Sequence, residues 1–143
     1  MRTFIFHSAR FDYTPYVQQH NNRIVENIAP PIGFGLYAST EQDFYPDENV
    51  QKWDSGITGR MTDGNNVSCY TVEHQGDRII PVRLVYHRAI ISSYNPENLI
   101  VKCDVLKKYT FLPGQSYFQI VAPDLAPFKV KQVQFLEDLF YHH

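Results

Sequence analysis

Two short stretches in the first third of the chain combine residue types that bind and orient ligands. His7 and Ser8 follow an apolar run, and an imidazole can donate or accept a hydrogen bond at a ligand hydroxyl. Residues 33–40 read GFGLYAST, and they place Gly35 two positions before Tyr37. Glycine lets a backbone approach a ligand closely, and the flat apolar face of a tyrosine ring is a surface for stacking. This pattern predicts one wall of a ligand pocket.

A third stretch, residues 115–123, offers amides rather than charged groups. It reads QSYFQIVAP, and strand alternation would place Gln115, Tyr117 and Gln119 on one face of a strand. The stretch contains no acidic residue. We therefore expect hydrogen-bonding groups there, but no charge.

The motifs of the common enzyme classes are missing from the sequence. It has no GxSxG nucleophile elbow, no GxxxxGK[ST] phosphate loop and no GxGxxG dinucleotide fingerprint. Its six histidines show no metal-ligand spacing, so we expect no metal site. These absences leave the three stretches above as the candidate functional site.

In order along the chain, FHS at residues 6–8, GFGLYAST at 33–40 and YFQIVAP at 117–123 resemble the motifs of the ADP-ribosyltransferase superfamily of the His-Tyr-Glu type. Members of that family open with a strand that ends in His-Gly or His-Ser. A helix follows, and then a strand of the form Gly-x-Gly-[Leu/Ile/Phe]-Tyr-x-[Ala/Thr]. A late strand starts with a glutamate and is shaped like Glu-Tyr-x-Val-x-x-Pro. The resemblance spans nearly the whole chain.

The resemblance implies an α+β fold in which two small, mostly antiparallel sheets form a cleft for NAD, the co-substrate. By the same resemblance, His7 would hydrogen-bond a ribose hydroxyl, and the backbone of Ser8 would pair with the nicotinamide carboxamide. Tyr37 would stack on the nicotinamide ring, Gly35 would give the ligand room, and Tyr45 would supply a second stacking face. The implied activity is mono-ADP-ribosyl transfer from NAD to a protein or another macromolecule. The small size of the chain suits an effector, toxin or viral protein in a host cytoplasm.

The sequence departs from this family at the glutamate. Counting back from the proline that ends the third stretch places Tyr117 at the position of the acid. Gln115 or Gln119 could hold a ribose hydroxyl there, but a neutral amide does not match a carboxylate that faces a cationic sugar. Losing one such group costs about 2.7–4 kcal/mol of transition-state stabilisation. Three alternatives follow: a weak transferase with His7, Tyr37 and Gln119 as catalytic residues, a transferase with an acid from elsewhere, or an inactive fold used for binding. The candidate acids elsewhere in the chain are Glu41, Asp43 and Glu97.

A catalytically inactive, β-rich protein-binding module is the competing hypothesis. Such a module would bind its partner by pairing an edge strand or through an exposed aromatic patch. The missing glutamate favours this hypothesis. The glycine–tyrosine wall, placed after His7 in the chain, favours the transferase and a protein target for it.

The composition fits one domain over residues 1–143, with a formal net charge of −2. Lysines and arginines are scattered, so the sequence shows no nucleic-acid footprint. Cys69 and Cys103 lie in separate strand-like runs, which is typical of free thiols in a reducing compartment. No apolar stretch approaches the length of a membrane span or a signal peptide. The sequence therefore predicts a soluble, cytoplasmic protein.

The stretches with candidate residues must be positioned by strands. Residues 2–8 alternate so that Phe4 and Phe6 share one face of a strand, while His7 lies on the other. Residues 33–38 predict a second, short strand with a glycine-rich entry.

Between these strands the sequence predicts a helix over residues 14–29. Thr14 is expected to cap it, with Pro15 at its first position. The proline pair that follows should end it. The expected apolar stripe consists of Val17, Ile24, Val25 and Ile28.

The acidic segment over residues 41–53 predicts two short helical pieces. Ser39 and Gln42 have the spacing of a capping box, and Pro46 divides the segment.

The second half of the chain predicts strands. We expect a hairpin in which residues 67–74 pair with residues 78–91 around Gln75-Gly76-Asp77. Further strands are expected over residues 98–106, 116–122 and 128–136. The whole chain therefore predicts an α+β fold with mostly antiparallel strands.

Overall fold

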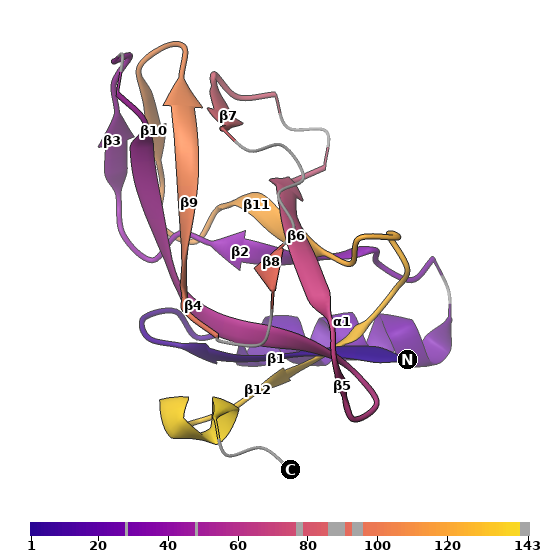
Figure 1. Ribbon diagram of the computed structural model, residues 1–143. Coiled ribbons are helices and arrows are strands. Elements are labelled where there is room, and N and C mark those ends of the chain that lie inside the picture. The colour runs from indigo at the N-terminus through magenta and orange to yellow at the C-terminus, as the bar shows by residue number, and fades with distance from the viewer. Residues whose placement is uncertain (28, 48, 77–78, 86–90, 93–95, 141–143) are drawn as a thin grey trace.

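The computed structural model describes residues 1–27, 29–47, 49–76, 79–85, 91–92 and 96–140. In this part of the chain the fold is α+β, with one α-helix, one short 3-10 helix and mostly antiparallel strands (Figure 1). In chain order the elements are β1 (Arg2–Ser8), α1 (Thr14–Glu26), β2 (Gly33–Tyr37), β3 (Gln42–Phe44), β4 (Gln51–Asp63), β5 (Asn66–Val67), β6 (Cys69–His74), β7 (Val82–Leu84), β8 (Ile91–Ser92), β9 (Asn98–Val105), β10 (Tyr109–Phe111), β11 (Ser116–Val121), β12 (Lys129–Gln132) and the 3-10 helix η1 (Leu136–Leu139).

The strands form two main sheets and one small separate pair. The larger sheet has the order β12-β1-β4-β9-β7, with β5 paired to β4, and the second sheet has the order β2-β11-β6-β8. The small pair consists of β3 and β10. Among the described strands, β1 and β12 run parallel, and the other pairs are antiparallel. Figure 1 shows β2 and β11 above β1, and the core lies between these two layers.

Aromatic rings fill much of the core between the two main sheets. Phe4 and Phe6 of β1 are fully buried, and the ring centroids of Phe6 and Phe34 in β2 lie 5.5 Å apart. Tyr13, just before α1, packs edge-on against Phe6 at 5.4 Å. Burying such a side chain stabilises the fold by about 1.5–3 kcal/mol. The predicted strand over residues 2–8, with both phenylalanines on one face, is confirmed.

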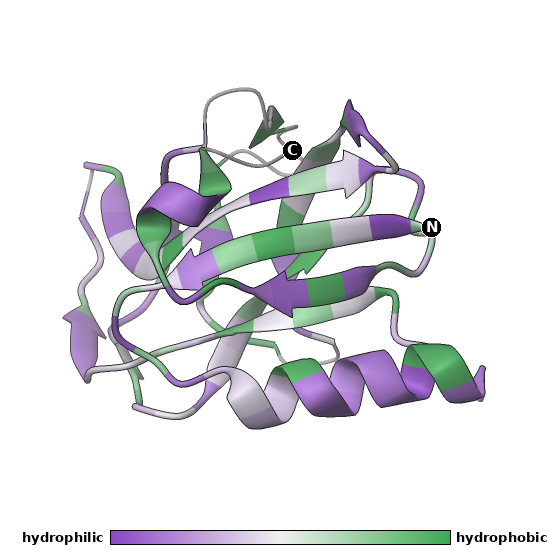
Figure 2. Ribbon diagram, turned by 90° about the horizontal axis from the view of Figure 1, so that it is seen from below, coloured by the Kyte–Doolittle hydropathy of each residue, from purple (hydrophilic) through white to green (hydrophobic). Residues whose placement is uncertain are grey.

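The opposite face of β1 carries a second, smaller apolar cluster. Ile5 packs there with Val133 and with Leu139 of η1. Figure 2, which views the molecule from below, shows η1 lying over this outer face and α1 lying alongside β12. The large sheet is therefore covered by the second sheet on its inner face and partly covered by η1 on its outer face.

Helix α1 begins where the sequence predicts, but its cap differs from the prediction. Tyr13 is the N-cap, and the backbone N–H of Thr14 donates to Asp12 Oδ1 at 3.0 Å. The helix ends at Glu26, three residues earlier than predicted, because Asn27 adopts a left-handed conformation that closes the last turn. The expected apolar stripe is only partly correct. Ile24 is buried and Val17 packs on the core, Val25 is 73 % exposed, and Ile28 lies outside the described residues.

The prediction of two helical pieces over residues 41–53 is wrong. Gln42–Phe44 form β3, and Gln51 begins the long strand β4. The local capping signal is overridden because Phe44 is fully buried and packs at 4.6 Å against Phe111 of β10, its partner strand. This contact joins segments that lie far apart in the chain, so no local sequence pattern predicts it.

The predicted hairpin between residues 67–74 and 78–91 is also wrong in its pairing. Strand β7 pairs with β9, through Val82↔Val105. Among the described residues of the predicted second arm, Ile91 pairs with β6, opposite Tyr70. Residues 77–78 and 86–90 lie outside the described residues.

The remaining strands follow the prediction more closely. Residues 98–106 and 116–122 correspond to β9 and β11. The predicted strand over residues 128–136 ends at Gln132 in β12, and η1 follows it. A register shift between Ser116 and Phe118 breaks the expected alternation in β11, so that Tyr117 and Phe118 are both buried.

Candidate functional site

A pocket of about 420 Å³ lies where α1, the start of β2, the end of β6 and β11 meet. Three residues that the sequence analysis singled out, Gly35, Tyr37 and Gln119, line this pocket together. The complete lining consists of Tyr16, Gln19, His20, Arg23, Pro31, Ile32, Gly33, Phe34, Gly35, Tyr37, Gln75, Gly76 and Gln119. The volume falls within the range of small-molecule sites, about 300–1,000 Å³.

One face of α1 forms a wall of the pocket. Tyr16, Gln19, His20 and Arg23 are spaced by three or four residues, so they share one side of the helix. None of these four residues belongs to the three sequence stretches that predicted the site. The helical spacing of polar and aromatic residues was the available signal.

The glycines of β2 make room for side chains from other strands. A Cβ atom at Gly33 would collide with Oε1 of Gln119 and would lie 2.7 Å from its Cδ atom. A Cβ atom at Gly35 would lie 2.9 Å from Oγ of Ser116 and 3.3 Å from Oε1 of Gln75. The two glycines thus allow amide side chains to lie directly over the β2 backbone.

Hydrogen bonds position these amides. Nε2 of Gln119 donates to the carbonyl of His74 at 3.3 Å. The backbone N–H of Gln75 donates to the carbonyl of Tyr117 at 2.9 Å, and its Oε1 lies 3.0 Å from the hydroxyl of Ser116. The pocket therefore has a polar floor of two carboxamides whose orientations are set by neighbouring strands.

The ring of Tyr37 keeps one face that Phe11 and Tyr16 do not cover. Its centroid lies 5.2 Å from that of Phe11, with parallel planes, and 4.2 Å from that of Tyr16. The centroids of Phe11 and Tyr16 lie only 5.8 Å apart. Rings on opposite faces of a third ring would be about 7 Å or more apart, since each layer needs about 3.5–4.0 Å. Phe11 and Tyr16 therefore share one face of Tyr37, and the ring of Tyr13 lies edge-on to Tyr37 with its centroid 5.9 Å away.

His20 is the buried polar group of the helical wall. It is only 6 % exposed, and its Nε2 lies 2.7 Å from the carbonyl oxygen of Phe128. Because a carbonyl only accepts, Nε2 carries the proton, and in the neutral ring Nδ1 is an acceptor. Desolvation lowers the pKa of His20 from its ordinary value, so the neutral ring is favoured.

Arg23 gives the pocket a positive charge. Its guanidinium donates to the carbonyl oxygen of Ala29 at 2.6 Å, and its side chain lies on the helix face that borders the pocket. No aspartate or glutamate occurs among the described residues that line the pocket. A ligand with an anionic group is therefore favoured over a cationic one.

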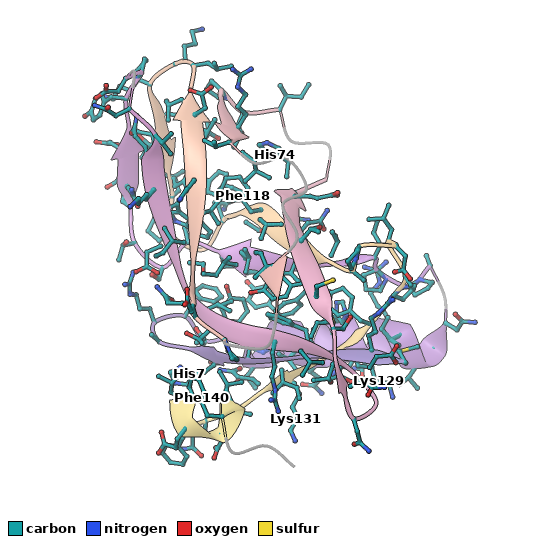
Figure 3. The ribbon with its side chains drawn as sticks, viewed as in Figure 1. His7, His74, Phe118, Lys129, Lys131 and Phe140 are labelled. Carbon is teal, nitrogen blue, oxygen red and sulfur yellow. The ribbon has the colours of Figure 1, made fainter. Side chains whose placement is uncertain are left out.

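The structure does not bring His7 to this pocket. His7 pairs with Thr58 of β4 and lies on the outer face of the large sheet, where Figure 3 shows it next to Phe140. The hydroxyl of Ser8 donates to the carbonyl of Phe11 at 2.7 Å, and so it stabilises the turn after β1. Neither residue lines the pocket of Tyr37.

Two other predicted site residues also lie elsewhere. Tyr45 is 52 % exposed beyond β3, and Nζ of Lys108 lies 5.3 Å from the centre of its ring. Gln115 is exposed in the turn before β11, and its backbone carbonyl accepts from the N–H of Ala38 at 3.0 Å. Tyr117, at the position where the family has its acid, is buried and stacks on Phe111 at 4.0 Å.

The alternative acids do not line the pocket either. Asp43 accepts a hydrogen bond from the hydroxyl of Thr110 at 2.6 Å, in the separate β3–β10 pair. Glu41 and Glu97 are exposed and are absent from the lining. Within the described part of the chain, no cluster of three histidine, cysteine or acidic side chains could hold a metal ion.

Comparisons with known proteins do not assign the chain to a family. No family model matches the sequence, and the search of the curated proteins finds no match. The structure, where it is described, contains no helix with the length and apolar character needed to cross a membrane. The fold and the pocket thus define an α+β protein with a site lined by aromatic rings and amides.

Proposed function

We propose that the protein binds a nucleotide of the NAD type in the pocket lined by Tyr37. The observation that carries the proposal is the convergence of Gly35, Tyr37 and Gln119 on one pocket. The resemblance to the ADP-ribosyltransferase superfamily associates this motif with NAD, and the remaining lining supplies matching chemistry.

Each part of such a ligand has a candidate partner in the lining. Tyr37 lines the pocket, and its ring offers a stacking surface for a flat ring. The amides of Gln75 and Gln119 can both donate to and accept from a carboxamide or ribose hydroxyls. The guanidinium of Arg23 suits a phosphate group, since planar guanidinium groups bind such oxygens well.

ADP-ribosyl transfer to a protein is a second proposal, and the geometry supports it less well than binding. Cleavage of the glycosidic bond develops positive charge on the sugar, and the described lining contains no carboxylate to stabilise it. Losing such a group lowers the rate by about a hundred- to a thousand-fold. His7, which the resemblance places at the ribose, lies on the other face of the large sheet. We therefore infer slow turnover for any transferase activity of this pocket.

A catalytically inactive protein-binding module is the third candidate. Pairing at the β12 edge is hindered, because Asn21 of α1 bonds both the N–H and the carbonyl of Val130, at 3.0 and 2.8 Å. The aromatic-patch version of this hypothesis is favoured by exposed side chains near the C-terminus: Phe135, Leu136 and Phe140, which are 42–55 % exposed.

Calorimetric titration of NAD into three proteins tests the binding proposal. We expect the wild type to bind NAD and Tyr37→Ala to bind about 2- to 12-fold more weakly, the range expected for one lost aromatic contact. His7→Ala should bind as the wild type does, because His7 lies outside the pocket. Thermal unfolding of each variant controls for the loss of contacts between Tyr37 and its neighbouring rings.

Two results would contradict this assignment. Absence of binding at millimolar NAD would remove the nucleotide proposal and favour the protein-binding module. An equal loss of binding in His7→Ala and Tyr37→Ala would show that the ligand binds outside the described pocket. Release of labelled nicotinamide that requires His7 would support the transferase instead.

A further inference from the structure

The outer face of the large sheet gathers three cations that lie far apart in the sequence. In the β12–β1–β4 registers, Lys131, Ile5 and Arg60 form one row across the sheet. Lys129 belongs to the next row, opposite Thr3 of β1. Side chains in register point to the same face of a sheet, and Figure 3 shows Lys129 and Lys131 below it. We call Arg60, Lys129 and Lys131 the basic face.

The three cations are not neutralised within the described residues. The ion pairs found there are Arg2–Asp124, Arg10–Asp54 and Arg83–Asp104, and none includes the basic face. Nε of Arg60 is buried and has no hydrogen-bond partner. Because this atom is shielded from solvent, an external anion could meet Arg60 only through its other N–H donors.

The spacing of the cations suits a chain of anions. Lys129 and Lys131 are two residues apart on a strand, which places their Cα atoms about 6.6 Å apart. Lys131 and Arg60 are two strands apart in one row, a separation of about 9.6 Å, and Ile5 between them is buried under Val133 and Leu139. A single small anion does not need charges so widely spread, whereas a strand with repeated phosphates meets several of them at once.

An exposed aromatic ring adjoins the cations. Phe140 is 53 % exposed, and Figure 3 shows it beside His7 at the end of β1, with Lys131 and Lys129 further along the same face. Basic grooves with exposed aromatic rings bind single strands, because unpaired bases stack on the rings while the cations meet the backbone. We propose that this face binds single-stranded nucleic acid, with phosphates at the basic face and a base against Phe140.

This surface is separate from the pocket of Tyr37, so the proposal does not depend on the proposed function. The sequence does not reveal the basic face, because residue 60 lies far from residues 129 and 131. The parallel pairing of β1 with β12 brings them together. Glu137 and Asp138 of η1 lie just before Phe140 in the chain, and their charges oppose a phosphate backbone and an anionic membrane alike, so the experiment includes both ligands.

Fluorescence anisotropy with a labelled single-stranded oligonucleotide of about 12 nucleotides tests the proposal. The variants are Lys129→Gln/Lys131→Gln and, as a control of equal charge change, Lys107→Gln/Lys108→Gln. For three phosphate contacts at about −0.7 each, log Kobs should fall with log salt at a slope of about −2. The basic-face variant should reduce the slope to about −0.7, and the control should retain the wild-type slope. Phe140→Ala should weaken binding about 5- to 150-fold.

Several outcomes would overturn the proposal. They are absence of binding at about 50 mM salt, equal losses in both double variants, or equally tight binding of heparin, a polyanion without bases. Binding to vesicles that contain an anionic lipid, without binding to the oligonucleotide, would identify a membrane surface instead. Circular dichroism of each variant ensures that a loss reflects the surface rather than the fold.

Discussion

An alanine at Gly59 would have to place its methyl group between β4 and two core phenylalanines of β1. The added Cβ atom would collide with Cζ of Phe4 and would lie 3.0 Å from Cβ of Phe6. Both phenylalanines are fully buried, so neither can move without displacing the core. Overpacking of this kind costs about 1–3 kcal/mol. For a domain of this size, about 3–4 °C per kcal/mol corresponds to a decrease in Tm of about 3–12 °C.

Gly33→Ala is the matched control, because its methyl group would collide with the flexible side chain of Gln119, while the buried Cγ1 of Val121 lies further away at 3.2 Å. The Gln119 amide can rotate away, at the loss of one hydrogen bond worth about 0.5–1.5 kcal/mol. Alanine also lowers the conformational entropy of the unfolded chain, which stabilises the fold by about 0.4–1 kcal/mol. The free energy of unfolding should therefore change by less than about 1 kcal/mol. Displacement of Gln119 should nevertheless weaken NAD binding.

Thermal unfolding followed by circular dichroism compares the wild type with both glycine variants. A Tm of Gly59→Ala within about 2 °C of the wild type would refute the reasoning that the Phe4 and Phe6 rings are immobile. A loss at Gly33→Ala as large as that at Gly59→Ala would show that Gln119 is not free to move.

Three further changes test the contacts around α1. Asn21→Ala should lower the urea midpoint by an amount equal to about 1–2 kcal/mol and increase light scattering, because the N–H and carbonyl of Val130 on the β12 edge lose their partners. Burial lowers the pKa of His20 below 6.5 in the fold, so the unfolded chain binds more protons. The stability that His20 contributes is complete above about pH 6.5 and is lost as pH falls towards the folded pKa. Urea unfolding at about pH 7.5 and 5.5 should show this loss, and His20→Gln should reduce it. Tyr13→Phe should lower Tm, since the N–H of Tyr37 then loses its acceptor at 2.9 Å, a cost of about 1–3 kcal/mol.

The sequence predicted the elements whose signals are local. Alternation over residues 2–8 placed Phe4 and Phe6 on the inner face of β1, and Pro15 marked the start of α1. The segment over residues 41–53 failed because a capping signal is worth about 1 kcal/mol. Burial of Phe44 against a strand more than sixty residues away is worth more, about 1.5–3 kcal/mol. Long-range pairing therefore decided the structure where the local signal was weak.

The predicted site residues also fall into two groups, those that the fold brings together and those that it keeps apart. Gly35, Tyr37 and Gln119 meet because β2 and β11 are adjacent strands, with Gly35 opposite Gln119. The same alternation that placed Phe6 in the core turned His7 outward, which the order of motifs along the chain did not take into account. The order of motifs along the chain indicates which elements are present. The strand face on which each side chain lies decides which of them can act together.

The glycines of β2 show that a residue type alone does not reveal which group lies close to the backbone, a ligand or another side chain. Gly33 and Gly35 suggested that a ligand comes near the backbone, and in the structure it is the amides of Gln119 and Gln75 that do so. The amide of Gln119 could not keep this position over a residue with a Cβ atom, whereas the amide of Gln75 would only have to shift slightly. The glycines therefore leave space for the amides that form the polar floor of the pocket, and Tyr37 forms its aromatic wall. A ligand would contact the amides rather than the bare backbone, so its specificity would depend on amide orientation, which His74 and Ser116 set through hydrogen bonds.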